Sequence, residues 1–173
     1  MSAANEPRVR YVPLEEAHLD AVMAIEVEAY PEPWGEQMFR DEIRYDKAYF
    51  YVVFLADEIV GYGGFWLVLD EAHLTSVTIR DVFRSRGYGR RLLTFLEETA
   101  KGLGARMASL EVRASNHRAR NLYCSSGYKA VGIRKGYYAR TNEDAVVMLK
   151  DLEQERPPGQ DTTSNQVGLD YQA

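Results

Sequence analysis

Arginine and glycine residues are concentrated in one short stretch that contains Arg84, Arg86, Gly87, Gly89 and Arg90. β-branched residues at 77–79 precede it and leucines with helical spacing at 92–96 follow it, which predicts a strand, a loop and a helix. The first turn of a helix leaves backbone N–H groups unpaired and carries partial positive charge. Glycine allows a phosphate to approach those groups, and guanidinium groups match phosphate geometry. The stretch therefore predicts a pyrophosphate cradle.

The cradle does not match two common nucleotide-binding motifs. No G-K-[ST] follows it, as a P-loop requires, and it lacks the G-x-G-x-x-G spacing of dinucleotide-binding folds. Its own pattern is R-x-x-G-x-G, which also occurs in ordinary turns. The residues alone therefore leave two interpretations, a turn or a site for another phosphate-bearing ligand.

Glu111 is a candidate general base. It lies in an apolar stretch, Leu110 to Val112, that predicts a strand parallel to the one before the cradle. Ligands of open α/β sheets bind beyond the carboxyl ends of parallel strands, and a partly desolvated carboxylate there can accept a proton. A solvent-facing glutamate on an amphipathic strand fits the same residues.

Tyr123 is a candidate general acid on a short helix predicted over 116–125. It follows Asn116 by seven residues, so the two residues share a helix face. A phenol can protonate a leaving group, although a core aromatic residue with its hydroxyl satisfied is the commoner explanation of such a tyrosine. Asn116 suits a helix N-cap, which does not exclude a ligand contact.

Composition limits the function classes. The chain has 173 residues, 46% of them hydrophobic, and a formal net charge of −5. We expect one domain, and the negative charge argues against general nucleic-acid binding. No apolar run approaches the ~20 residues of a membrane span, and the first residues lack a secretory segment. The three histidines have no metal-site spacing, so we expect no metal. The single cysteine, Cys124, is expected to be a small buried residue and cannot form an internal disulfide, which fits a cytoplasmic location.

The elements that must position these groups follow from periodicity and turn residues. Strands are predicted at 9–12, 48–56, 59–68, 73–79, 106–112, 128–133 and 144–150, and helices from 14, at 36–44, from 90 and at 116–125. A polar loop is predicted at 134–143. The fold class is α/β, with a single domain over 8–153 between a flexible N terminus (1–7) and a tail of disordered composition (154–173). Tyr30 and Trp34 occupy a loop, where they either grip a substrate or anchor the loop on the core.

These motifs together resemble the GNAT superfamily of acetyl-coenzyme A-dependent N-acetyltransferases over about Arg10 to Leu152. The stretch from Leu110 to Tyr128 fills L-E-V-R-A-S-N-x-x-A-x-x-L-Y-x-x-x-G-Y, which is similar to the RimI-type N-terminal alanine acetyltransferases of ribosomal proteins. Segments R-x-x-Y-Y and E-D-A-V-V-M match as well. The resemblance implies a central six- to seven-stranded, mostly antiparallel sheet, with one parallel pair splayed at the cofactor site and about four flanking helices.

The resemblance also implies roles for individual residues. Glu111 would be the base and Tyr123 the acid of direct acetyl transfer, without a metal. The implied acetyl-coenzyme A contacts are Val77, Thr78, Ile79, Arg84, Ser85, Arg86, Gly87, Tyr88, Gly89, Arg90 and Asn116. The expected acceptor contacts are Tyr30, Trp34, Tyr137 and Tyr138.

The expected partner is a protein N terminus, most simply that of a small-subunit ribosomal protein beginning with alanine. We expect no direct nucleic-acid or membrane binding, and a monomer or weak dimer. The alternatives are a GNAT enzyme acting on other protein N termini, lysine side chains or a small amine, and a coenzyme A-binding module without catalysis.

Overall fold

Seven strands form one sheet in the computed structural model, in the order β1-β2-β3-β4-β5-β7-β6. Their bounds are β1 (Val9–Pro13), β2 (Ala48–Leu55), β3 (Glu58–Val68), β4 (Glu71–Ile79), β5 (Met107–Arg113), β6 (Lys129–Tyr138) and β7 (Glu143–Asp151). The structure describes residues 8–154, so the predicted flexible N terminus (1–7) and the predicted tail after residue 154 lie outside the described residues. Neighbouring strands are antiparallel except for β4 and β5, which confirms the predicted mixed α/β sheet.

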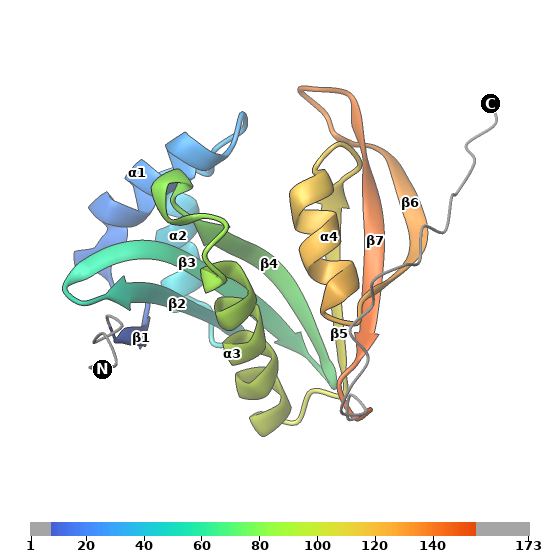
Figure 1. Ribbon diagram of the computed structural model, residues 1–173, viewed down its shortest axis with the longest axis horizontal. Coiled ribbons are helices and arrows are strands. Elements are labelled where there is room, and N and C mark those ends of the chain that lie inside the picture. Colours follow the sequence, from blue (N-terminus) through green and yellow to red (C-terminus); the bar gives the residue numbers. More distant parts are fainter. Residues whose placement is uncertain (1–7, 155–173) are drawn as a thin grey trace, which may run out of the picture.

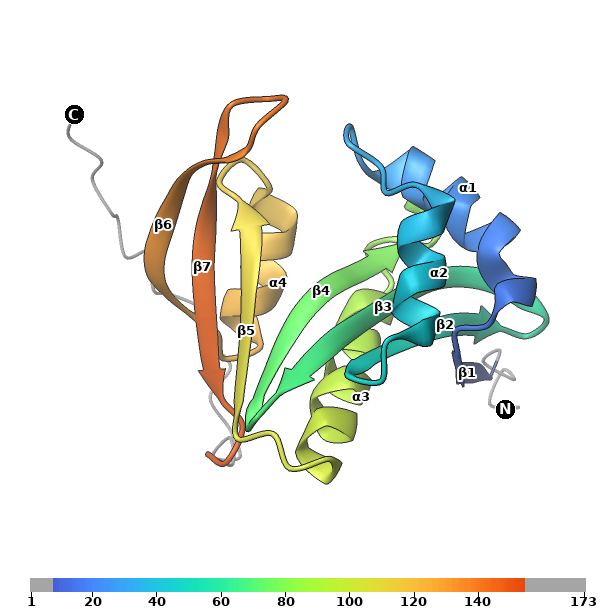
Figure 2. The ribbon, with the colours of Figure 1, turned by 180° about the vertical axis from the view of Figure 1, so that it is seen from behind.

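Within the described residues, four α-helices flank the sheet, namely α1 (Leu19–Ala29), α2 (Glu36–Arg44), α3 (Tyr88–Gly102) and α4 (His117–Ser125). Two short 3-10 helices, η1 (Glu16–His18) and η2 (Asp81–Phe83), precede α1 and follow β4. Helices α1 and α2 lie on one face of strands β1–β4, while α3 lies on the opposite face (Figures 1 and 2). Helix α4 packs beside β5 and β7.

Two buried clusters hold these layers together. One joins α1 and α2 to β2 and β3 and includes Val52 and Tyr62, and the other joins α3 and α4 to the sheet and includes Val53 and Tyr123. Successive residues of a strand point to opposite faces, so Val52 and Val53 enter different clusters. The apolar run that predicted β2 therefore contributes to both layers.

The parallel strands β4 and β5 are paired only at their beginning. Their register runs from Glu71 opposite Met107 to His73 opposite Ser109 and goes no further. Beyond that point the two strands diverge, and the sheet opens into a V with β1–β4 on one side and β5–β7 on the other (Figures 1 and 2). The predicted splayed parallel pair is thus present, and it places a gap in the middle of the sheet.

Three local expectations were wrong. Strand β6 continues to Tyr138 through residues predicted as loop, because Gly136 at a φ of +61° lies within a register shift and its N–H donates to Asp144 Oδ1 at 2.8 Å. The first helix begins at Leu19 after η1, not at residue 14. Cys124 is exposed on α4 and not buried.

Candidate active site

A cleft of about 1340 Å³ lies where β4 and β5 separate. The segments that line it are the α1–α2 loop, β4, the glycine-rich cradle, β5, α4 and the β6–β7 turn. It is lined by these predicted site residues: Tyr30, Trp34, Val77, Thr78, Ile79, Arg84, Ser85, Gly87, Gly89, Arg90, Glu111, Asn116, Tyr123 and Tyr138. Arg86, Tyr88 and Tyr137 were predicted with them but do not line the cleft.

The cradle presents backbone rather than side chains to the cleft. Gly87 precedes α3 at a φ of +84°, a left-handed conformation that favours glycine, and no side chain within residues 8–154 caps the helix. The amides of the first turn of α3 are therefore available to an anion. Asn116 caps α4 by accepting the N–H of Ala119 at 3.1 Å, as its sequence position predicted.

Glu111 points to the face of the sheet opposite α3 and α4. Its neighbours Leu110 and Val112 belong to the cluster under those helices, so the alternation of the strand turns Glu111 the other way. Oε2 of Glu111 lies 2.5 Å from Nε2 of His73, and Oε1 accepts a hydrogen bond from Nη1 of Arg134 at 2.9 Å. The Glu111 side chain is only 14% exposed, whereas His73 is 33% exposed. The carboxylate is thus held by two partners and connected to solvent through an imidazole.

Tyr123 lies on the other face of the sheet, in the cluster shared by α3 and α4. Burial raises the pKa of its phenol above the usual value, so the group is neutral at physiological pH. No residue within 8–154 hydrogen-bonds its hydroxyl. Because the gap interrupts the sheet here, a ligand between β4 and β5 is flanked by Glu111 on one face and Tyr123 on the other.

The α1–α2 loop is fixed from within the N-terminal half. Tyr30 and Thr78 share a hydrogen bond of 2.7 Å between their hydroxyl oxygens, and the N–H of Trp34 donates to Oε1 of Glu26 at 2.8 Å. Oε2 of Glu26 accepts the hydroxyl of Tyr62. Burial raises the pKa of Glu26 to about 7. Tyr30 and Trp34 therefore line the cleft and also anchor the loop, so both interpretations of these aromatic residues describe part of their role.

The opposite wall of the cleft is organised by Arg113 at the end of β5. Its guanidinium carbon lies 3.9 Å from the ring centroid of Tyr138, and Nη1 donates to Oγ1 of Thr141 at 2.7 Å. Nη2 lies 3.7 Å from Oε1 of Glu32, which belongs to the α1–α2 loop. Tyr137 turns outward, and the guanidinium carbon of Arg134 lies over its ring, 4.6 Å from the ring centroid. Only one residue of the predicted tyrosine pair faces the cleft.

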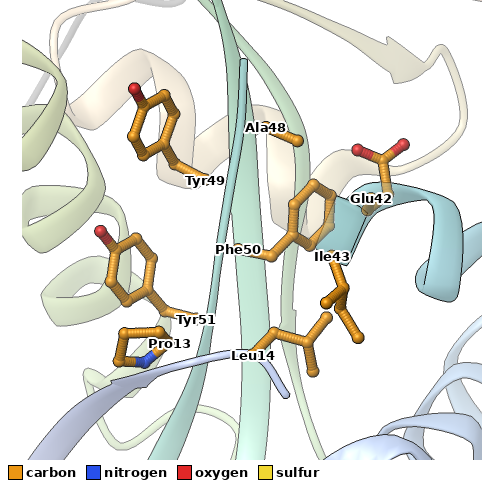
Figure 3. A pocket seen from close by; sticks show the side chains of 8 residues that line it. All are labelled: Pro13, Leu14, Glu42, Ile43, Ala48, Tyr49, Phe50 and Tyr51. Carbon is orange, nitrogen blue, oxygen red and sulfur yellow. The ribbon is translucent and has the colours of Figure 1, made fainter. Parts of the chain in front are cut away.

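A smaller cavity of about 290 Å³ lies beside β2, and none of its lining residues lines the cleft. Tyr49 and Tyr51 point to the opposite side of the strand from Phe50 (Figure 3). The carboxylate of Glu42 at its rim already accepts Nε1–H of Trp66 at 2.6 Å. Because its polar groups diverge or are already paired, this cavity is a poor candidate for chemistry.

No three His, Cys, Asp or Glu side chains within residues 8–154 are grouped so that they could hold a metal ion. None of the helices there is long and apolar enough to span a membrane.

Comparison with known proteins agrees with this geometry. Residues 19–128 match the model of the acetyltransferase (GNAT) family. A Bacillus subtilis (strain 168) protein named as a candidate ribosomal protein bS18-alanine N-acetyltransferase is 38% identical over 81% of this chain and 92% of its own length. The ribosomal protein bS18-alanine N-acetyltransferase of Salmonella typhimurium is 36% identical over 78% and 92%. The crystal structure of the Escherichia coli ribosomal-protein-S18-alanine N-acetyltransferase superimposes with a TM-score of 0.78 at 28% identity, covering 88% of this chain and 99% of the other.

Proposed function

Because the chain belongs to the acetyltransferase (GNAT) family, we propose that it transfers the acetyl group of acetyl-coenzyme A to the N-terminal α-amine of a protein, with the N-terminal alanine of ribosomal protein bS18 as the acceptor. The names of relatives that align with most of the chain support the acceptor. The observation that carries the chemistry is the placement of Glu111 and Tyr123 on opposite faces of one gap.

The cleft fits a long, phosphorylated thioester. The edge of β4 from Val77 to Ile79 has no partner in β5, and of its groups the carbonyl oxygen of Ile79 accepts a hydrogen bond from Arg84. The other backbone groups on this edge can bond the amides of the pantetheine arm as a strand would. The amides of Ser85 to Arg90 and the start of α3 suit the pyrophosphate. Acetyl-coenzyme A supplies an activated acyl group with a thiolate leaving group.

Glu111 is the proposed proton acceptor. An N-terminal α-amine has an ordinary pKa of about 7.7–8.0, so a modest base is sufficient to deprotonate it. The proton passes to the carboxylate, whose Oε2 contacts His73 at 2.5 Å, and the more exposed imidazole offers it a path to solvent. Arg134 holds the second oxygen and keeps the carboxylate oriented toward the gap.

Tyr123 is the proposed proton donor. In the step the amine nitrogen bonds to the thioester carbonyl carbon, the carbon–sulfur bond breaks, and the sulfur takes the proton of the Tyr123 hydroxyl. Burial keeps that hydroxyl protonated until a thiolate forms beside it. An α-ammonium group loses two protons on becoming an amide. Glu111 accepts the first before the attack, and the second, released as the carbon–nitrogen bond forms, restores the hydroxyl of Tyr123 after the thiolate has taken its proton. The charges therefore balance without a covalent enzyme intermediate.

The acceptor approaches from the face on which Glu111 lies. The α1–α2 loop with Tyr30 and Trp34 forms one wall of this entrance, and Tyr138 over Arg113 forms the other. We assign contact with the acceptor to Tyr138. The ring of Tyr137 instead packs against the guanidinium group of Arg134, outside the cleft.

A panel of acceptors tests the proposal through thiol release from acetyl-coenzyme A. The panel contains a peptide with the N-terminal residues of bS18 after loss of the initiator Met, the same peptide starting with Ser, an N-terminally blocked peptide with an internal lysine, and spermidine. We expect rapid turnover of the free alanine terminus alone. Turnover of the blocked peptide or of spermidine would support acetyl-coenzyme A as the acetyl donor but contradict the proposed acceptor. Binding of coenzyme A without any turnover would favour the alternative of a coenzyme A-binding module without catalysis.

A further inference from the structure

The arginine side chains of the cradle are already engaged by the protein. Nε of Arg84 donates to the carbonyl oxygen of Ile79 at 2.9 Å, and its Nη1 pairs with Asp81. Arg90 reaches α4, where its Nη2 donates to Oγ of Ser125 at 2.6 Å and its Nη1 to Oγ of Ser126 at 3.2 Å. These guanidinium groups shape the loop and fasten α3 to α4. The two cradle arginines that line the cleft are therefore both committed to protein partners, and the third, Arg86, lies over the ring of Phe83 and does not line the cleft.

One face of α4 lies against the first turn of α3. A Cβ placed on Gly89 would meet Cδ2 of Leu122 at 3.6 Å, and Ser125 accepts the hydrogen bond from Arg90. Arg118, Leu122 and Ser125 have the spacing i, i+4 and i+7, so they form one stripe of the helix. Arg118 is the end of this stripe nearest to the N terminus of α4, and it lines the same cleft as Gly87 and Gly89.

Arg118 is exposed, and it has no ion pair or hydrogen bond with any residue that the structure describes. It therefore differs from Arg84 and Arg90, which line the cleft with their guanidinium groups bound elsewhere. Arg120, two positions further along α4, donates to the carbonyl oxygen of Ala114 at 2.8 Å and does not line the cleft. An uncommitted guanidinium at an anion site is suited to bidentate phosphate binding.

We propose that Arg118 binds a phosphate group of the coenzyme A moiety and provides the principal cationic contact of the cradle. This inference rests on the proposed use of acetyl-coenzyme A. The backbone amides of α3 would then supply neutral donors and Arg118 the charge. Two phosphate sources share this chemistry, the pyrophosphate and the 3′-phosphate of the ribose.

Calorimetric titration of the purified protein with coenzyme A, 3′-dephospho-coenzyme A and pantetheine separates these sources. We expect Arg118→Gln to weaken coenzyme A binding about tenfold, because a charge-assisted pair is lost, and to leave pantetheine binding unchanged. If the contact is to the 3′-phosphate, the variant binds coenzyme A and the dephospho form equally well. If the contact is to the pyrophosphate, both affinities fall by the same factor.

Lys101→Gln is the matched control, since it removes one positive charge from the last turn of α3, away from the cradle. It should bind coenzyme A as the unaltered protein does. In kinetics, Arg118→Gln should raise the KM for acetyl-coenzyme A without lowering kcat. An Arg118→Gln protein that binds all three ligands normally would overturn the assignment of Arg118 alone. Failure of the unaltered protein to bind coenzyme A would instead overturn the proposed function.

Discussion

The carboxylate of Glu111 has a partner on each oxygen, and the two partners differ in kind. Arg134 is permanently charged and fixes the orientation of the group, while His73 contributes an imidazole whose ring nitrogens can accept or donate a hydrogen bond. In the proposed mechanism a proton taken from the amine can therefore be shared with the imidazole without disturbing the ion pair on the other oxygen. We infer that Glu111 and His73 act together in that step.

We predict that Glu111→Gln lowers kcat by ~10²-fold or more at neutral pH, because the amide cannot accept the proton. The KM for acetyl-coenzyme A should change little, since Glu111 faces the acceptor side. His73→Gln should produce a smaller loss and displace the pH–rate profile, which a purely structural role would not do. Steady-state rates from pH 6 to 9 measure both, with Glu98→Gln on the exposed face of α3 as the control. Near-normal turnover in Glu111→Gln would remove this residue from the mechanism.

Glu26 predicts a dependence of stability on pH. Its pKa is raised from 4.5 to about 7 by burial, so between these values the unfolded chain releases a proton that the folded chain retains. Stability should therefore fall as pH rises through this window, by at most about 3 kcal/mol. Urea unfolding at pH 5 and pH 8 should show Glu26→Gln gaining stability relative to the unaltered protein at the higher pH. A constant difference between the two proteins would contradict the prediction.

The sequence pointed to Glu111 and Tyr123, which both line the cleft, because each lies within a long motif. It did not reveal His73, which is 38 positions from Glu111 and meets it only through the register of the parallel pair. It also could not show that Arg84 and Arg90 are bound by the protein, because side-chain direction in a loop depends on neighbours from other elements.

At the scale of elements, the two walls of the acceptor entrance come from opposite halves of the sheet. Glu32 of the α1–α2 loop and Arg113 of β5 connect them, with 3.7 Å between Oε1 and Nη2. Both side chains are largely buried, at 24% and 15% exposure, so the charges are weakly screened. The pair holds the loop against the C-terminal half.

We predict that Glu32→Gln raises the KM for the acceptor peptide by roughly threefold, because a partly buried ion pair is weakened and the loop is less well positioned. The KM for acetyl-coenzyme A should not change. Initial rates with both substrates varied test this. Glu36→Gln, which alters an exposed carboxylate bound to Arg40 outside the cleft, is the control. A rise in the KM for acetyl-coenzyme A in place of the acceptor would disprove the role.

Most elements could be predicted from periodicity, and β6 shows where that information ends. Lys135 and Gly136 in the middle of a polar run indicate a loop by composition. The strand nevertheless continues, because pairing with β7 and the bond from Gly136 to Asp144 tolerate a bulge there. Such pairing is a tertiary effect that local sequence does not record.

At the scale of the whole molecule, the two halves share three residue pairs of the parallel ladder, supplemented by contacts such as Lys150 of β7 with Glu97 of α3 at 2.5 Å. Ligand in the gap should join them more firmly. At a coenzyme A concentration of 100 times Kd we expect about 2.7 kcal/mol of added stability. Hydrogen exchange should slow most at amides that face the gap within 74–79 and 110–113. Protection spread evenly over the chain would contradict binding between the two strands.

The divergence of β4 and β5 has one more consequence. An ordinary open sheet exposes two edge strands, whereas this one exposes four, because the gap creates an edge on each side of it. Unpaired edges are templates for the strands of other chains. The two inner edges belong to β4 and β5, which come together where His73 is paired with Ser109. The space between the two strands therefore narrows to a closed end. The taper that would receive the thin pantetheine arm in the proposed function therefore also limits the room for a strand of another chain at these inner edges.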